Sequence, residues 1–304
     1  MSDFNHLNPD IRDQLELPAD ERAGRMLVER FITHERLVPI FNHVEFLIYM
    51  PPQTRANGLV VSGKPGSGKT MLSRAIKRRY APVPAENGKA ASRPVLTINM
   101  TGAREAKILY NRILIGLGVP DPGRYSGADR ERMVLKLCST ANLKLLIVDE
   151  IQDILTSTAR QQRIALDTIK FLMNELSLPI LTLGTSQAPA AMQVDEHLNA
   201  RFKYRELPVW ERDAYLKNFL DTLEKALPLR NPSYLSSPTL SKELIKLSGG
   251  ILQSIMQLVI HAAAHAVETG DEQITTKLLQ RAAIEPPLAA AKQAALLAEM
   301  RQVA

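Results

Sequence analysis

The chain has 304 residues, of which 45% are hydrophobic and 23% charged, and its formal net charge is +6. This composition excludes an intrinsically disordered protein, and the single cysteine, Cys138, excludes an internal disulfide framework and a cysteine-based zinc site. The polar start and the absence of a long apolar run lead us to expect a cytoplasmic protein with no membrane partner, and the mild positive charge permits a polyanionic partner without identifying one.

Three regions follow one another along the chain. Residues 1–55 carry a helical spacing of apolar residues that ends at two consecutive prolines. Residues 56–210 alternate short apolar strands with helices, and residues 211–304 show helical periodicity alone. We therefore expect an α/β fold with a five-stranded parallel sheet covered by helices on both faces, preceded by a helical segment and followed by an all-helical domain. The strands are predicted at 58–63, 94–100, 144–150, 179–185 and 204–209.

A phosphate-binding loop is predicted where the first strand meets the next helix. The sequence 63-GKPGSGKT-70 matches G-x-x-x-x-G-K-[ST]. Its glycines allow a tight turn whose N–H groups point at phosphate oxygens, and the helix start adds a positive end. Lys69 would bridge the β- and γ-phosphates, and the Thr70 hydroxyl would bind Mg²⁺. The predicted nucleotide-binding residues are Gly63, Lys64, Pro65, Gly66, Ser67, Gly68, Lys69, Thr70 and Met71.

Two carboxylates follow the third strand, in 145-LLIVDE-150. Asp149 has the position of a second anchor for Mg²⁺, and Glu150 can deprotonate an attacking water as a general base. A complete strand lies between the predicted loop helix and Asp149, which indicates the additional-strand branch of P-loop ATPases. No N-K-x-D motif for guanine is present in the sequence. The predicted cofactors are therefore ATP and Mg²⁺.

Two further residues are predicted to act on the γ-phosphate. The fourth strand ends in 184-GTSQA-188, where a polar side chain would lie beside Asp149; we favour Thr185, with Ser186 as the alternative. Arg201 comes just before the fifth strand, where oligomeric ATPases supply an arginine to a neighbouring subunit's nucleotide. Arg201 is therefore predicted to act in trans, with Arg205 as the second choice. A plain turn and a solvated surface arginine are the ordinary alternatives.

Other polar residues carry weaker signals. His261 and His265 are spaced i, i+4, but the glutamate of H-E-x-x-H is missing, so ordinary helix-face histidines are favoured over metal ligands. Cys138 lies on an apolar helical face, which predicts a buried and unreactive thiol. Arg104 and Lys107 fall early in the helix after the second strand, and in an oligomeric ring that helix can line the central surface. We therefore treat this pair as candidate DNA contacts.

Together these motifs resemble the AAA+ ATPases, with a P-loop NTPase core and a helical lid. More narrowly they resemble the TniB family of ATP-binding transposition proteins, which is related to TnsC and more distantly to MuB and IstB. The resemblance covers about residues 18–270 and depends most on 161-QQR…NEL…LGT-185 and 201-RF…LPVW-210. It implies an ATP-dependent regulator that assembles as a ring or filament of identical subunits on double-stranded target DNA. Such a protein recruits or activates a DDE transposase.

Two positions depart from the family's pattern. Gln152 stands where many TniB-like sequences have histidine, and we assign this position no essential part in the chemistry. The stretch 249-GGILQS-254 has no arginine, although AAA+ proteins often carry one there to sense the nucleotide. Hydrolysis is accordingly expected to be slow or partner-stimulated. Two alternatives stay open: an AAA+ helicase loader or other DNA remodeller, and a weakly hydrolysing ATP-binding adaptor in signalling.

Overall fold

The computed structural model describes residues 4–28, 31–51, 53, 55–84, 91–103 and 105–287. The chain divides into two compact units by its internal contacts. The sheet unit is Arg36–Pro208, and the helical unit combines the residues up to Glu35 with those from Val209 onward. The division falls inside the expected N-terminal segment 1–55, so that segment contributes to both units. Within the described residues, none of the helices combines the length and the apolar character that a membrane crossing requires.

A five-stranded parallel sheet forms the centre of the sheet unit, with strand order β2-β3-β4-β1-β5. Every residue of the adjacent strands β1 and β4 is buried, so both faces of the sheet are covered there. This confirms the predicted fold class. The strands span Gly58–Gly63 (β1), Val95–Asn99 (β2), Leu145–Asp149 (β3), Ile180–Gly184 (β4) and Phe202–Leu207 (β5).

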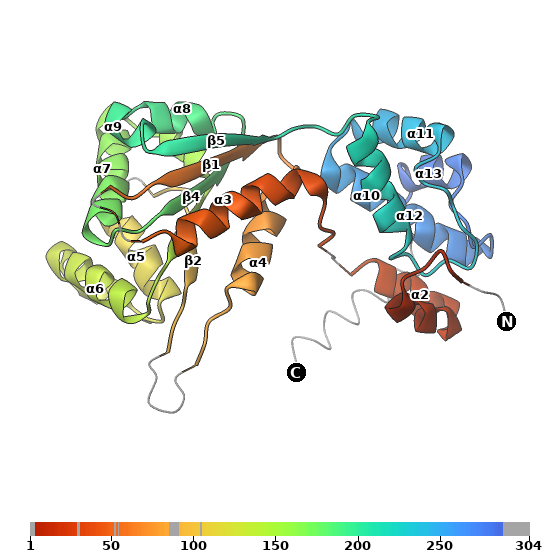
Figure 1. Cartoon of the computed structure of the whole chain (residues 1–304), viewed down its shortest axis with the longest axis horizontal. Coiled ribbons are helices and arrows are strands. Elements are labelled where there is room, and N and C mark those ends of the chain that lie inside the picture. The colour runs from red at the N-terminus through yellow and green to blue at the C-terminus, as the bar shows by residue number, and fades with distance from the viewer. Residues whose placement is uncertain are drawn as a thin grey trace. The chain divides into compact units, whose positions relative to one another are not determined.

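Helices flank this sheet (Figure 1). The longest, α7, begins with a capping box in which Thr158 and Gln161 satisfy each other's backbone N–H groups. The described α-helices of the unit are α3 (Val38–Tyr49), α4 (Lys69–Arg79), α5 (Ala106–Gly116), α6 (Gly127–Thr140), α7 (Ala159–Glu175), α8 (Ala188–Gln193) and α9 (Glu196–Asn199). Short 3₁₀ turns lie at η2 (Glu35–Leu37), η3 (Pro122–Arg124) and η4 (Ile151–Thr156).

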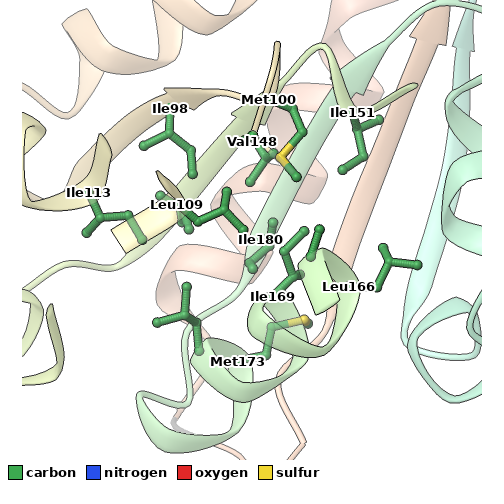
Figure 2. Close-up of a cluster of buried hydrophobic side chains, with 14 of the residues drawn as sticks. Ile98, Met100, Leu109, Ile113, Val148, Ile151, Leu166, Ile169, Met173 and Ile180 are labelled. Atoms are coloured by element: carbon green, nitrogen blue, oxygen red, sulfur yellow. The ribbon is translucent and has the colours of Figure 1, made fainter. Parts of the chain in front are cut away.

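Branched and long apolar side chains fill the space between the sheet and its helices. Figure 2 shows Ile98 of β2, Val148 of β3 and Ile180 of β4 packed with Leu109 of α5 and Ile169 of α7. Each of the five is at most 4% exposed, and burying such a side chain contributes about 1.5–3 kcal/mol. This core holds the parallel strands in place. The polar residues at the ends of β1, β3 and β4 are therefore fixed relative to one another.

The helical unit draws on both ends of the described chain. Helix α2 packs along α12, and the buried Arg22 of α2 pairs with Glu272, which follows α12. Apolar periodicity alone could not show this long-range pairing. The unit contains α1 (Pro9–Arg12), η1 (Asp13–Glu16), α2 (Ala19–Met26), α10 (Ala214–Glu224), α11 (Pro238–Ser248), α12 (Leu252–Thr269) and α13 (Thr276–Ala282).

Candidate functional site

The loop between β1 and α4 has a backbone that only glycine adopts readily. Gly66 and Gly68 have φ values of 77° and 97°, in the left-handed region that other residues avoid. A Cβ on Gly63 would lie 2.7 Å from Ser67 Oγ and 2.9 Å from the carbonyl oxygen of Leu207. No side chain caps the first turn of α4, so its N–H groups can bind an anion. The cradle fits a phosphate group.

Lys69 is folded back over this loop. Its Nζ donates hydrogen bonds to the carbonyl oxygens of Gly63 at 2.8 Å and Lys64 at 3.0 Å, and the residue is 8% exposed. Burial lowers the pKa of Lys69, while the charges of Glu150 and Asp149 oppose that shift. The charges of the two carboxylates predicted from LLIVDE, Asp149 and Glu150, therefore act on the ammonium group of Lys69.

The two carboxylates occupy the carboxyl end of β3. Asp149 is the last residue of the strand, and its Oδ1 accepts the backbone N–H of Glu150 at 3.0 Å. Burial raises the pKa of Asp149, with the Glu150 charge acting in the same direction, whereas the backbone hydrogen bond and Lys69 lower it. Glu150 has φ 57°, which is uncommon for a residue with a side chain and often marks a functional turn.

The residues predicted to hold Mg²⁺ are a hydroxyl and a carboxylate. Thr70 is exposed as the second residue of α4, and Asp149 is partly buried. Both supply the oxygen ligands that Mg²⁺ prefers, and a protein commonly holds this ion with one or two such groups together with substrate phosphates. No group of three or more His, Cys, Asp and Glu side chains in the described part of the chain could hold a metal by itself. The donor set fits a metal shared with a nucleotide.

Gln152 lies next to these carboxylates, which differs from the expectation that this position has no essential part in the chemistry. Its Nε2 donates to Oε2 of Glu150 and, at 3.3 Å, to Oδ1 of Asp153. Its Oε1 accepts the backbone N–H of Thr185 at 3.0 Å. The sequence marks this position in two ways: it departs from the family's histidine, and it lies with Asp153 between the apolar residues Ile151 and Ile154.

Thr185 comes directly after β4, where a sensor of the γ-phosphate is predicted. Its Oγ1 accepts the backbone N–H of Gln187 at 3.3 Å, and its own N–H is bound by Gln152. The alternative, Ser186, is exposed in the same turn. The structure thus connects Thr185 to Glu150 through one side chain, while its role as a sensor stays a prediction.

Arg201 lies at the opposite end of the sheet from the phosphate loop. It precedes β5, and its carbonyl oxygen accepts the N–H of Gly58, the first residue of β1. The loop begins at Gly63, five residues further along that strand, so the two ends are about 17 Å apart. Arg205 pairs with Val61 inside the sheet and is exposed. Arg201 is therefore placed away from the phosphate loop of its own chain.

The candidate DNA contacts are only partly described. Lys107 is exposed near the start of α5 and forms an ion pair with Glu105 at 2.8 Å. Arg104 lies outside the described residues. Lys107 therefore has a local partner, which an incoming phosphate would have to displace.

The histidines and the cysteine have ordinary surroundings. His265 is buried in α12, with its Nε2 3.0 Å from the carbonyl oxygen of Glu285. Burial lowers the pKa of His261, with the His265 charge acting in the same direction. Cys138 is 3% exposed on α6, and burial raises the pKa of its thiol to about 12. A thiol with that pKa is a poor nucleophile near neutral pH.

Comparison with known proteins identifies the fold and a family. The family model described as "Bacterial TniB protein" matches residues 22–212. A comparison with curated proteins gave no match. Similar solved structures include the ORC2 protein of Aeropyrum pernix in its ADPNP–ADP complexes, at 16% identity and a TM-score of 0.59, covering 86% of this chain and 71% of that one.

Two more solved structures show the same fold. The Aeropyrum pernix ORC1 protein in complex with DNA is 15% identical, with a TM-score of 0.59 over 86% of this chain and 68% of that one. Cdc6p from Pyrobaculum aerophilum is 13% identical, with a TM-score of 0.61 over 84% of this chain and 68% of that one. At these identities the likeness is one of fold, that of the AAA+ ATPases.

Proposed function

Because this chain belongs to the bacterial TniB family and is an AAA+ ATPase, we propose that it regulates DNA transposition. It binds target DNA as an oligomer, with ATP binding and hydrolysis as the assembly switch, and it recruits or activates a DDE transposase. We place this activity in the cytoplasm.

The observation that carries the ATP-dependent part is the phosphate loop, over which the buried Lys69 folds with hydrogen bonds to Gly63 and Lys64; the carboxylates that end β3 interact electrostatically with the same ammonium group. Lys69 and the N–H groups of the loop would bind phosphate oxygens, while Thr70 and Asp149 would hold Mg²⁺. The ion would supply neutralisation of charge on the phosphates. Glu150 accepts a proton from the attacking water. Thr185 contacts the γ-phosphate from the end of β4.

The oligomeric part of the proposal depends on where Arg201 lies. The backbone of Arg201 lies about 17 Å along the sheet from the phosphate loop, so its side chain is placed to complete the site of an adjacent subunit and not that of its own chain. Nucleotide binding then stabilises the contact between subunits, and hydrolysis weakens it. ATP turnover therefore requires assembly. The stretch 249-GGILQS-254 has no arginine that could sense the nucleotide within one chain, which supports this dependence on a neighbour.

DNA binding is supported by charge and by analogy. The net charge of +6 is mild for one chain, but many subunits along one duplex multiply weak contacts. One protein of similar fold, the Aeropyrum pernix ORC1 protein, was solved in complex with DNA. Arg104 and Lys107 are the proposed contacts.

The decisive experiment combines electron microscopy with DNA binding. The protein is mixed with duplex DNA without nucleotide, with ATP and with a slowly hydrolysed analogue, at several salt concentrations. We expect rings or filaments on DNA with the analogue, salt-sensitive binding and neither with Lys69→Ala. Nucleotide binding without DNA binding would instead support the adaptor alternative. DNA assemblies that leave a DDE transposase unstimulated would support the loader or remodeller.

A further inference from the structure

Gln152 joins the proposed general base to the strand that carries the proposed sensor. The residue is 9% exposed and lies in the short η4 turn after Glu150. Its amide nitrogen donates to the Glu150 carboxylate, and its amide oxygen accepts the N–H of Thr185, 33 residues further along the chain. One side chain therefore bridges the ends of β3 and β4.

The orientation of this amide follows from its partners. The backbone N–H of Thr185 can only donate, so it must face the amide oxygen of Gln152. The carboxylates of Glu150 and Asp153 accept when ionised, so they face the amide nitrogen. Reversing the amide would place two donors together at Thr185 and oxygens together at Glu150. The two partners thus fix which end of Gln152 faces which strand.

The fold also leaves room for this bridge. Gly184 is the last residue of β4, and a Cβ there would lie 2.3 Å from Oε1 of Gln152 and 2.9 Å from Cβ of Ala188. Gly184 has no positive φ, so its backbone conformation alone does not require glycine. Glycine at this position is required by the close approach of the amide and the neighbouring helix.

We propose that Gln152 is a positioning residue that holds the Glu150 carboxylate and couples it to the turn after β4. When Thr185 shifts, its hydrogen bond displaces the side-chain amide of Gln152. The amide in turn displaces the Glu150 carboxylate to which it donates. The state of the turn after β4 then sets whether Glu150 can act on water. This inference rests on the proposed ATPase role of Glu150 and adds a route by which the site regulates that role.

The side chain offers a substitution that separates its two hydrogen bonds. Gln152→Glu keeps an oxygen for the N–H of Thr185 but replaces the donor to Glu150 with a second carboxylate oxygen. Gln152→Leu removes both bonds at a similar size. Gln187→Glu is the matched control, because it makes the same glutamine-to-glutamate change at an exposed position in the turn after β4.

The variants are compared by steady-state ATP hydrolysis, by binding of a fluorescent ATP analogue with Mg²⁺, and by amide hydrogen exchange of the peptide containing Thr185. We expect kcat to fall at least about 10-fold in both Gln152 variants, a smaller loss than the 10²–10⁴-fold of a missing general base. KM and the analogue's Kd should stay within about 3-fold of wild type, because the phosphate loop is untouched. Exchange at Thr185 should rise in Gln152→Leu and not in Gln152→Glu.

Three results would overturn the inference. The first is kcat within about 3-fold of wild type in both variants while Glu150→Gln is inactive, a pattern that leaves the proposed function standing. The second is a loss of nucleotide binding in proportion to kcat, which indicates a structural role alone. The third is an equal rise in exchange at Thr185 in both variants. Failure of the proposed ATPase itself is recognised separately, by turnover that survives Lys69→Ala.

Discussion

The guanidinium of Arg201 donates a hydrogen bond to Oδ1 of Asn174 at 2.7 Å, so the last turn of α7 holds the arginine in front of β5. A side chain held in this way is presented to a neighbour with less loss of conformational freedom than a mobile one. Arg201 is therefore a better candidate for action in trans than Arg205, which lies within the β5 strand.

Arg201→Ala is expected to separate nucleotide binding from assembly-dependent hydrolysis. Binding of ATP by the monomer should be unchanged, since the residue lies about 17 Å along the sheet from the phosphate loop. DNA-stimulated hydrolysis should fall by at least about 100-fold, because such an arginine can contribute 10³–10⁵ to kcat. Arg205→Ala serves as the control and should retain most activity. Equal losses of DNA-stimulated hydrolysis in the two variants would contradict the role of Arg201 in a neighbouring subunit's site.

Glu150→Gln is expected to bind ATP and to trap the assembled state. The substitution keeps the size of the side chain but removes the group that accepts a proton, so hydrolysis should fall about 10²–10⁴-fold. Nucleotide-dependent complexes on DNA should persist for longer than those of wild type, as measured by dissociation after dilution. Rapid turnover by this variant would contradict the role of Glu150 as the base.

Gly250→Ala should destabilise the helical unit more than Gly249→Ala does. Both glycines have positive φ, at 72° and 60°, so both substitutions strain the backbone. Only at Gly250 does a Cβ meet other atoms, with the carbonyl oxygen of Trp210 at 2.3 Å, where the N–H of Trp210 also donates to Gly250 at 2.8 Å. We expect an extra loss of about 1–3 kcal/mol in urea unfolding. Equal losses would show that the contact with Trp210 can relax.

Burial of Cys138 makes the protein less stable in alkaline solution. The folded chain raises the pKa of this thiol from 9.0 to about 12, so folding favours the neutral form. The stabilisation is complete below about pH 9 and is lost as the pH rises toward 12. This group alone then contributes a slope of about 1.4 kcal/mol per pH unit. The difference between the urea unfolding midpoints at pH 8 and pH 10.5 should therefore be smaller in Cys138→Ala than in wild type. A thiol reagent at pH 8 should label Cys138 only after unfolding.

The main features of the sheet unit were predictable from sequence because they depend on neighbouring residues. The glycines and Lys69 of 63-GKPGSGKT-70 specify a turn at the end of β1. The apolar runs specify buried parallel strands, and LLIVDE places Asp149 and Glu150 where β3 ends. The predicted strand positions agree with the observed ones to within a few residues.

Tertiary structure alone decided the relationships between distant residues. Helix α2 joins the helical unit through Ala23 and Met26, which pack in its core, and through Arg22, which pairs with Glu272 250 residues away. The bridge from Glu150 to Thr185 exists because β3 and β4 are neighbours and Gly184 leaves space for Gln152. Local patterns specify helices, strands and turns through short-range sterics and burial. Partners across the fold depend on strand order and packing, which no stretch of sequence contains by itself.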